Sequence, residues 1–313
     1  MDVLCASWRL STRTQYGTYI KKWQEYCRQE TLNSHCTAVE SVIEFLSYLF
    51  HVHKLSYSAI NCARSALASV VLLENSNCTI STHPLVTRFM KGVFHLRTPL
   101  PRYNHIWDVK IVLDHLRKMS PASKLSLCEL THKLCMLLAL TSAQRAQTLF
   151  YIHIDGLVWK DNSVEIHVSD LVKQNKTSDR VGSTTTIEEY PSEKRLCVVR
   201  YLKKYIERTK VMRDTERHLF ICHRKPHKRA SKQTISRWIK ETMSAAGIDT
   251  RIFKPHSTRA AAVSTAKTAD VPIADILKQA GWSNEETFNR FYDKPSIRAG
   301  PTCRFSMAVL DNH

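Results

Sequence analysis

Apolar side chains recur at helical spacing through the first hundred residues. In the stretch STRTQYGTYIKKWQEYC, an N-cap at Ser11 precedes positions that share one helical face: Tyr16, Tyr19, Ile20, Trp23, Tyr26 and Cys27. Similar runs follow a cap at Thr37, surround Ile60 through Val71, and extend from Pro84 through Phe94. These four amphipathic helices predict a compact all-α domain over residues 1–97.

The stretch HLRTPLPRYNH breaks this periodicity. It contains two prolines and no amphipathic spacing, so residues 98–104 are predicted to form a linker. Beyond it, helical runs over Trp107–Met119 and Leu125–Leu140 lead into the strand-like segments HIDGLVWK and SVEIHVSDLV, joined by the turn DNS. A second turn, QNKTSD, leads to a third strand, GSTTTIEEY. The pattern predicts a small antiparallel sheet inserted between helices.

Helices resume after this sheet. One is predicted over Glu193–Arg208, and another in SKQTISRWIKETMSAAG, where Gly247 ends the helix and four apolar residues share a face: Ile235, Trp238, Ile239 and Met243. The fold class is therefore predicted to be mainly α with a small antiparallel β-sheet. It consists of an all-α N-terminal domain and an α+β domain over residues 105–313.

The charge of the chain indicates a polyanionic partner. Its 313 residues carry a formal net charge of +18, and 43% of them are hydrophobic, which is enough to bury a core. The first hundred residues hold 10 Lys and Arg against 6 Asp and Glu, so the excess of basic residues continues through both domains. Nucleic acid is the partner that such a balance favours, and solubility alone is the alternative.

The cysteines and the apolar runs indicate a soluble intracellular protein without a metal. Ten cysteines occur singly, with no CxxC pair, which is typical of reduced thiols. Cys222, His223 and His227 fall close together, but no second ligand pair lies at zinc-finger spacing, so no metal site is predicted. The N-terminus lacks a signal pattern, and runs such as CMLLAL are too short to span a bilayer.

The stretch FKPHSTRAAA carries the first candidate chemistry. His256 and Arg259 are three residues apart at the start of an alanine-rich helix, so they share a face near its N-terminus. Spare backbone N–H groups and the helix dipole favour an anion there. A buried unpaired arginine would be costly, so the pattern predicts a phosphate at this point; a structural salt bridge is the alternative.

The next stretch, DVPIADILKQAGWSNEETFNRFYDKP, predicts two short helices around a corner. Asp270 is expected to cap the first, with Pro272 in its first turn and Gly281 at its end. Ser283 and Glu286 form a capping box that starts the second. Trp282 then lies in the corner, and Tyr292 follows where the second helix could direct its hydroxyl. A tyrosine at the edge of the core is the alternative.

Three other basic residues join this set. Arg145 follows the apolar helix that ends in LALTSAQ, and it opens the next element. Lys173 and Lys176 lie at the second hairpin turn, where a projecting tip could reach a cleft. Each of them alone is as consistent with a solvated side chain.

Taken together, the order Arg, hairpin Lys, His-x-x-Arg, Trp, Tyr resembles the tyrosine recombinase family, and most closely its eukaryotic Crypton-type transposon members. The similarity extends over nearly the whole chain and includes STRTQYGTYIKKW, TISRWIK, HSTRAAA and AGWSNEETFNRFY. It implies a SAM-like core-binding domain over 1–97 and a catalytic domain over 105–313.

The resemblance also implies roles. Arg145, His256 and Arg259 would contact the scissile phosphate, Trp282 would hold the position of the family's His or Trp, and Tyr292 would be the nucleophile. Lys173 is favoured as general acid because it follows an apolar pair, and Lys176 is the rival. Two departures from the family pattern are Thr148 in place of an acidic residue and a Trp282-to-Tyr292 interval one residue longer than commonest.

The implied function is site-specific DNA recombination through a 3′-phosphotyrosine, with integration or excision of a mobile element as the outcome. No cofactor is expected. The partner would be double-stranded DNA, clamped by the two domains and bound by a dimer at each site and a tetramer in the synapse. In a eukaryote the protein would act in the nucleus, and otherwise in the cytoplasm or nucleoid.

Some alternatives remain at this stage. SKQTISRWIK would lie against the major groove through Lys232, Arg237 and Lys240, or else would be a core helix with a solvated outer face. The tail after Tyr292 would pack on a neighbouring subunit or on its own domain. A non-catalytic DNA-binding protein that kept the fold and a monomeric relaxing topoisomerase are the competing functions.

Overall fold

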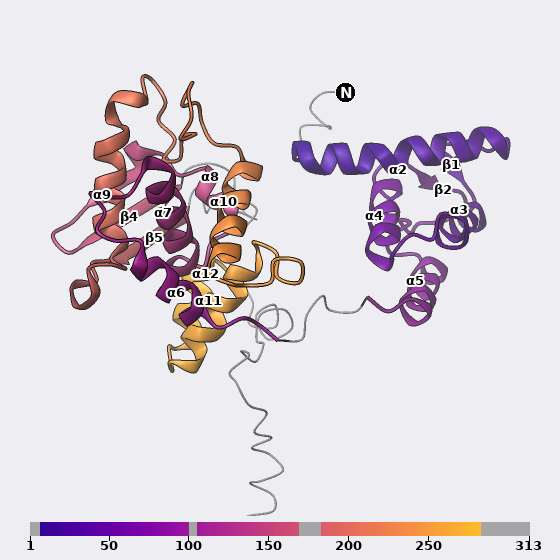
Figure 1. The fold of residues 1–313 in the computed structure, drawn as a ribbon. Helices are drawn as coiled ribbons and strands as arrows, with labels where there is room; N and C mark the ends of the chain where they lie inside the picture. Colours follow the sequence, from indigo (N-terminus) through magenta and orange to yellow (C-terminus); the bar gives the residue numbers. More distant parts are fainter. Residues whose placement is uncertain (1–6, 100–104, 169–182, 283–313) are drawn as a thin grey trace, which may run out of the picture. The chain divides into compact units, whose positions relative to one another are not determined.

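The computed structural model describes residues 7–99, 105–168 and 183–282. The chain divides into two compact units, Met1–Pro101 and Arg102–His313, which are described one at a time (Figure 1). The predicted linker, 98–104, includes residues 100–104, which lie outside the described part.

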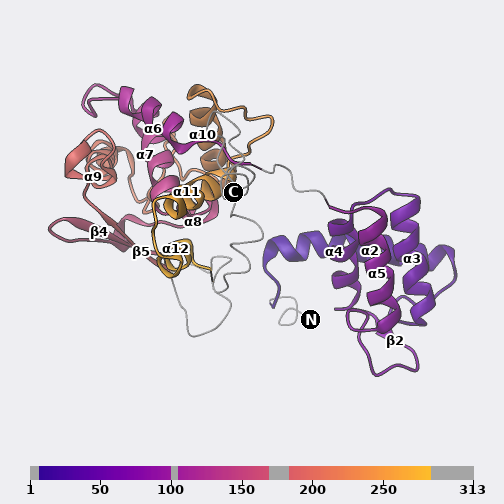
Figure 2. The ribbon, with the colours of Figure 1, turned by 90° about the horizontal axis from the view of Figure 1, so that it is seen from below.

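Four helices build the N-terminal unit: α2 (Leu10–Gln29), α3 (Val39–His51), α4 (Tyr57–Leu67) and α5 (Pro84–Leu96). Helix α4 contacts each of the other three, and the four pack around one apolar core (Figure 2). Trp23 is fully buried in that core, beside Phe45 with ring centroids 5.1 Å apart. Its indole N–H donates to the carbonyl of Ser34 at 2.9 Å, so the polar end of the ring is also satisfied.

The N-terminal unit is not purely helical. Two short strands, β1 (Cys36–Thr37) and β2 (Leu72–Leu73), pair in parallel. The pairing explains why Thr37 is not the predicted cap of α3: it lies in β1 and is 3% exposed, and Ala38 takes the N-cap position. Ser11 is likewise not a cap, because α2 begins at Leu10 after Arg9. The third predicted helix also ends earlier, at Leu67.

The helices of the C-terminal unit are α6 (Val109–Lys118), α7 (Leu127–Thr141), α8 (Ala146–Phe150), α9 (Val198–Thr209), α10 (Lys232–Ala245), α11 (Ser257–Thr268) and α12 (Ile273–Ala280). Single 3-10 turns lie at Ile154–Gly156, Pro191–Glu193 and Lys210–Met212. The helix predicted from Glu193 therefore begins later, at Val198, and the segment before it is a turn that contains Pro191.

Helix α7 is the centre of this unit. It begins with a capping box, in which Ser126 and Glu129 each bond the other's backbone N–H. Nearly every residue from Leu130 to Leu140 is buried, since α8, α9, α10 and α11 all contact this helix (Figure 1). A helix that is apolar on all sides belongs inside a domain, which is the position the structure gives it.

One buried basic side chain interrupts the apolar surface of α7. Lys133 has no solvent exposure, and its Nζ donates to the carbonyls of Leu116 and Met119 at 2.7 and 2.6 Å and to the Tyr201 hydroxyl at 2.8 Å. Burial, with Arg195 nearby, lowers the pKa of Lys133 to about 7. The side chain thus ties the end of α6 to α7 and α9.

The predicted sheet is present. Its strands, β3 (Leu157–Trp159), β4 (Ser163–Val168) and β5 (Ser183–Glu188), pair antiparallel in the order β3-β4-β5. Alternate residues of β4 are buried, which turns one face of the sheet to the core: Val164, Ile166 and Val168. The second hairpin turn, with Lys173 and Lys176, lies outside the described residues.

The predicted fold class, mainly α with a small antiparallel sheet, is confirmed for the chain. Gly247 follows α10 with a φ of 94°, as the predicted helix stop requires. Asp270 is not the cap of α12, because Pro272 occupies the N-cap position and Asp270 itself has a left-handed φ of 57°. No helix in the described ranges is both long and apolar enough to cross a membrane.

Candidate active site

Helix α11 carries the most deeply buried residue of the predicted site. Small side chains let this helix pack closely in the core, and four of them are buried: Ala260, Ala261, Val263 and Ser264. At the start of the helix, the Ser257 hydroxyl accepts from the Trp107 indole N–H at 2.9 Å in a buried hydrogen bond. The N-terminus of α11 is thereby fixed against the segment that precedes α6.

Arg259 lies inside the protein, only 2% exposed. Its Nη2 donates to the carbonyl of Ala280 at 2.7 Å, at the C-terminal end of α12. Carbonyls at a helix C-terminus carry partial negative charge, so this position stabilises a guanidinium. Its central carbon also lies 4.2 Å from the centroid of the Trp282 ring, a favourable cation–π geometry.

The turn after α12 places Trp282 over that guanidinium. Gly281 has a φ of 67°, a left-handed conformation that suits glycine. The N–H of Trp282 donates to Leu277 at 2.9 Å and that of Gly281 to Lys278 at 3.1 Å, which together form a Schellman motif. The predicted helix stop at Gly281 is therefore confirmed, while the second helix, which would complete the corner at Trp282, lies outside the described residues.

The turn that carries Arg145 reaches the same end of α12. Gln144 is 5% exposed, and its side-chain amide donates to the carbonyl of Gln279 at 2.8 Å. Gln144 and Arg259 therefore bond consecutive carbonyls, those of Gln279 and Ala280. In return, the Gln279 amide donates to the carbonyl of Thr141 at 3.0 Å, so the ends of α7 and α12 are joined in both directions.

Arg145 itself is half-buried at the N-cap position of α8. The family's acidic residue three positions later is replaced by Thr148, which is 6% exposed and donates to the Gln144 side-chain oxygen at 3.3 Å. Thr148 thus stabilises the turn through Gln144. Ala143, just before, packs with Val263 and Ala280.

His256 is the residue before α11 and is exposed, whereas Arg259, one turn further, is buried. The structure therefore brings Arg259 and Trp282 together at the C-terminal end of α12, and it places the turn of Arg145 at that same end. His256 lies at the start of α11, the helix that carries Arg259. Lys173, Lys176 and Tyr292 lie outside the described residues, as does the predicted capping box of Ser283 and Glu286. Gln144 and Gln279 were missed from the sequence, because no local pattern indicates that two glutamines so far apart would meet.

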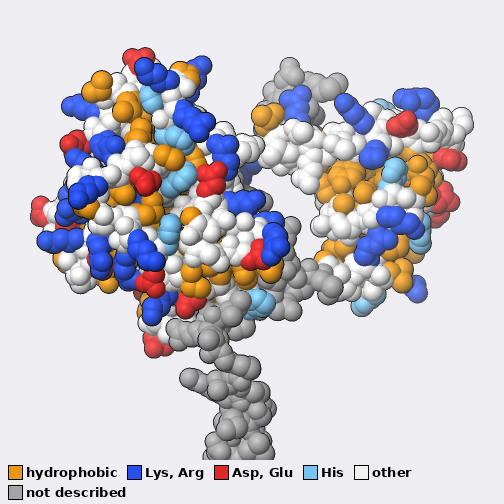
Figure 3. All heavy atoms as spheres, in the orientation of Figure 1, with side chains coloured by type: hydrophobic (Ala, Val, Ile, Leu, Met, Phe, Trp, Pro, Cys, Tyr) orange, Lys and Arg blue, Asp and Glu red, His pale blue; other side chains and the backbone are white. Residues whose placement is uncertain are grey.

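Helix α10 has one buried face and one exposed basic face. Its apolar residues pack on α7 and α8, while Arg237 and Lys240 are exposed. Lys232 is engaged within the protein: its Nζ donates to the Tyr151 hydroxyl at 3.1 Å and lies 5.0 Å from the Phe150 ring centroid. On the face drawn in Figure 3, Lys and Arg side chains are spread over both units and exceed the acidic ones.

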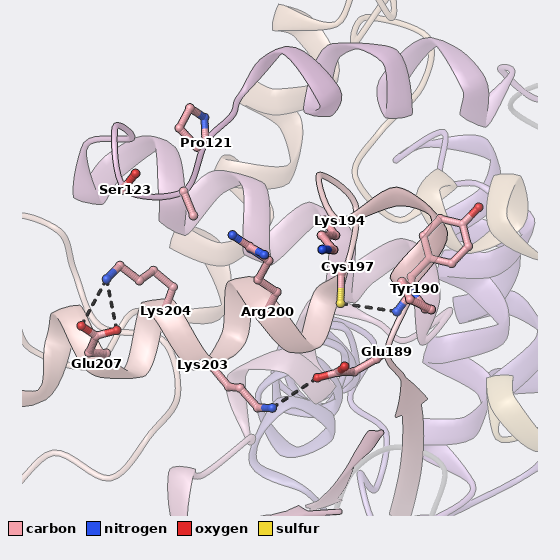
Figure 4. A pocket seen from close by; sticks show the side chains of 12 residues that line it. Pro121, Ser123, Glu189, Tyr190, Lys194, Cys197, Arg200, Lys203, Lys204 and Glu207 are labelled. Atoms are coloured by element: carbon pink, nitrogen blue, oxygen red, sulfur yellow. Dashed lines mark hydrogen bonds and ion pairs between the residues drawn. The ribbon is translucent and has the colours of Figure 1, made fainter. Parts of the chain in front are cut away.

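A cavity of about 490 Å³ beside α9 has a basic lining but contains none of the predicted site residues. Figure 4 shows two of its lysines in ion pairs. Lys203 Nζ lies 3.2 Å from Glu189 Oε1, and Lys204 Nζ lies 3.1 Å from Glu207 Oε2. Carboxylates thus compensate two of its four basic side chains, the others being Lys194 and Arg200. Since it holds no predicted site residue, the α12 corner stays the candidate site.

Comparison with known families decides the identity of the fold. Residues 111–296, more than half of the chain, match the model described as the phage integrase family. The chain belongs to the phage integrase family. The matched range of this phage integrase homologue contains the positions of Arg145, His256, Arg259, Trp282 and Tyr292.

Individual relatives of this phage integrase homologue are distant. An integrase/recombinase XerD homolog of Selenomonas ruminantium is 22% identical over 167 residues, or 50% of this chain and 49% of that protein. The chain thus spans about half the length of the curated relative that it matches.

Solved structures share the fold. The post-cleavage complex of the XerH recombinase with its difH substrate has a TM-score of 0.56 at 12% identity, covering 87% of this chain and 71% of that one. A lambda integrase dimer bound to a COC′ core site also has a TM-score of 0.56, at 13% identity over 94% and 92% of the chains. The Tn1549 transposon integrase has a TM-score of 0.53 at 13% identity, over 88% and 85%.

Proposed function

We propose that this chain is a site-specific DNA recombinase that cleaves and rejoins DNA through a covalent 3′-phosphotyrosine at Tyr292. The observation that carries the proposal is the meeting of Arg259, Trp282 and the Arg145 turn at the end of α12. Trp282 is ten positions before Tyr292 in the sequence. Membership of the phage integrase family supports the same assignment.

The two arginines suit the charge that develops in the reaction. Attack on a phosphodiester gives a five-coordinate phosphorus with growing negative charge on its non-bridging oxygens. Guanidinium groups can hold those oxygens bidentately, and a fixed donor is already oriented before the charge appears. Arg259 is fixed by Ala280 and Trp282, and we assign Arg145 as the second clamp. The Trp282 indole N–H is assigned as a further donor to the phosphate.

The strand-transfer step balances without an external energy source. The Tyr292 oxygen forms a bond to phosphorus while the bond from phosphorus to the 5′ oxygen breaks. Because a tyrosine has a pKa of about 10, its proton must be removed, and His256 is the base that we assign. Lys173, or Lys176 as its rival, supplies a proton to the departing 5′ oxygen. Attack by a 5′ hydroxyl on the phosphotyrosine then reverses every step and reseals the strand.

Double-stranded DNA is the proposed partner of both units. We assign residues 1–97 as a core-binding domain and 105–313 as the catalytic domain with its tail. Arg237 and Lys240 lie on the exposed face of α10, where they could meet a phosphate backbone. Arg237 Nε is 3.7 Å from Glu241 Oε1 and Lys232 is engaged with Tyr151, so each of these two would have to exchange a contact. Neutralising phosphates would make the affinity steeply dependent on salt.

Assembly and biological setting extend the same proposal. Structures of lambda integrase include a dimer on a core site and a tetramer on a Holliday junction, which supports a dimer per site and a tetrameric synapse for this chain. The Tn1549 transposon integrase supports integration or excision of a mobile element. We also propose that the chain is related to the Crypton-type transposon recombinases of eukaryotes. It would act in the nucleus of a eukaryotic host and otherwise in the cytoplasm or nucleoid.

A covalent-trapping experiment tests this function. The full chain is incubated with a library of nicked suicide oligonucleotides, and protein–DNA adducts that survive SDS are counted. We expect an adduct from the wild type and from Tyr190→Phe, a control at an exposed tyrosine, and none from Tyr292→Phe. Absence of an adduct from all three proteins, with DNA binding retained, would instead favour a non-catalytic DNA-binding protein. If the wild type forms the adduct and also relaxes supercoiled DNA without pairing two sites, a topoisomerase would be favoured.

A further inference from the structure

A second group of reactive side chains lies at the opposite end of α7 from Arg145. Cys128 and His132 are one helical turn apart near the start of α7, and His223 comes from the segment that follows Phe220–Cys222. One ligand atom of each residue lies within 4.8 Å of the others. The Cys128 Sγ is 3.9 Å from His132 Nε2.

A carboxylate from a third segment joins the group. Glu241 lies on α10, which packs against α7 (Figure 1). Its Oε2 is 3.4 Å from the same His132 Nε2. Four atoms held tetrahedrally by one Zn²⁺ at about 2.0–2.3 Å lie about 3.3–3.7 Å from each other. The 3.4 Å separation lies within that range and the 3.9 Å separation slightly above it, so small side-chain movements would complete a tetrahedron.

The surroundings partly enclose these four side chains. The four residues line one cavity of about 600 Å³. The Trp238 ring shields it, with centroids 6.0 Å from the His132 ring and 5.9 Å from the His223 ring. Within the described part of the chain, the His223 Nδ1 is buried without a hydrogen-bond partner. A buried imidazole nitrogen without a hydrogen bond costs free energy. Coordination of a metal by Nδ1 would give that nitrogen a partner, and coordination by Nε2 would fix the tautomer of the ring.

Charge balance follows from the same four residues. Binding a divalent ion there would release the Cys128 thiol proton to solvent, and the thiolate and the Glu241 carboxylate would then neutralise the ion.

We propose that Cys128, His132, His223 and Glu241 form a structural Zn²⁺ site that ties α7, α10 and the segment after Cys222 together. A thiolate with two imidazoles selects zinc over magnesium or calcium, and four protein ligands close the site to substrate. The site differs from the trio considered from the sequence, because the His227 ring nitrogen Nδ1 is engaged with the Cys222 carbonyl at 2.9 Å. Cys128 and His132 are about ninety or more residues from His223 and Glu241, which is why no zinc-finger spacing indicated the four together.

Metal titration of the tag-free full chain tests the site. After removal of metal with a chelator, Co²⁺ is added as the spectroscopic probe and Zn²⁺ as the competitor. We expect one equivalent of Co²⁺ to bind with a thiolate-to-cobalt charge-transfer band and the strong visible bands of a tetrahedral ion. Zn²⁺ should displace it and raise the melting temperature of the protein.

Variants locate the ligands. Cys128→Ser should abolish the charge-transfer band, and Glu241→Gln, at a more exposed position, should weaken Co²⁺ binding by more than the about 10–100-fold typical of outer-sphere changes. Cys222→Ser removes a thiol from the same cavity and should leave the spectrum unchanged. The proposal fails if no stoichiometric ion binds, or if Cys128→Ser keeps the band while Cys222→Ser loses it. Tyr292→Phe should bind Co²⁺ normally, so this test is independent of strand cleavage.

Discussion

The interiors of the two units differ in polarity. Among the described residues of the N-terminal unit, Thr37 is the single buried polar side chain, and no Lys or Arg is buried. In residues 105–168 and 183–282, the C-terminal unit buries 13 polar or charged side chains, including Lys133, Arg213 and Arg259. Both units are built mainly from helices, so secondary structure does not account for the difference.

The buried polar side chains of the C-terminal unit are concentrated near the candidate site. Seven of the 13 buried polar side chains fall in two short segments, 142–148 and 257–264, and these are the segments that carry Arg145 and Arg259. Burying a polar group costs free energy unless it is hydrogen-bonded, so such groups gather where a particular geometry has to be held. The contrast supports our proposal that the C-terminal unit, rather than the N-terminal one, holds the catalytic site.

Replacing the central aromatic residue of the apolar core should have the largest effect. Trp23→Ala is expected to destabilise the N-terminal unit by about 3–5 kcal/mol, because it leaves a large cavity and frees the Ser34 carbonyl. Hydrogen exchange in the full chain would measure this separately for each unit. Protection of α7 should be unchanged, and equal loss in both units would show that their interiors are not energetically distinct.

The next largest effect is expected on catalysis. Arg259→Ala should slow strand cleavage by about 10²–10³-fold, which is typical for loss of one fixed donor to a developing oxyanion. Single-turnover cleavage of a suicide substrate measures this rate, and circular dichroism checks the fold. Arg251→Ala is the matched control, since that side chain is 91% exposed and paired with Asp249. Cleavage by Arg259→Ala at the wild-type rate would remove α11 from the proposed site.

Replacing a buried side chain away from the predicted site should lower the stability of the C-terminal unit and leave the rate of strand cleavage unchanged. Lys133→Met is expected to destabilise the C-terminal unit by about 1–3 kcal/mol, because the carbonyls of Leu116 and Met119 lose their donor. Urea denaturation measures the loss, and Lys118→Met at an exposed position serves as control. A large fall in cleavage rate with unchanged stability would contradict this division of roles.

The pH dependence of stability gives a finer test of the same side chain. Between about pH 7 and 10 the unfolded Lys133 holds a proton that the folded one has lost, since its pKa falls from 10.5 to about 7. The unfolded state binds more protons, so stability should rise with pH by up to about 1.4 kcal/mol per unit relative to Lys133→Met. Parallel stability curves for the two proteins would show that burial does not shift this group.

Sequence periodicity was sufficient to predict the fold class, and proline and glycine positions were sufficient to predict some helix ends. Pro84 begins α5 and Gly281 ends α12, because each acts through its own backbone geometry. The caps predicted at Ser11, Thr37 and Asp270 were wrong, since a capping residue is effective only where the surrounding chain starts a helix. Strands β1 and β2 were missed because two-residue strands have no readable alternation.

The residues of the candidate site stay a prediction, and the contacts that support them were not predictable from the sequence. The turn at Gly281 and Trp282 follows from a local signal, a glycine after a helix, whereas the contact of Trp282 with Arg259 joins two helices and was not predicted. The bond from Gln144 to Gln279 joins segments more than a hundred residues apart, as does the proximity of Glu241 to His132. Such contacts depend on how α7 packs with α10 and α12, and no local spacing encodes that.

Mass-spectrometric mapping of the residue linked to DNA tests the central claim most directly. Wild-type adduct from a suicide oligonucleotide is digested with nuclease and trypsin, and the modified peptide is identified. A nucleotide remnant on Tyr292, within the fragment FYDKPSIR, is the predicted result. A remnant on any other residue, or an unmodified fragment in a protein that has cleaved DNA, would contradict a site that presents Tyr292 to a phosphate held by Arg145 and Arg259.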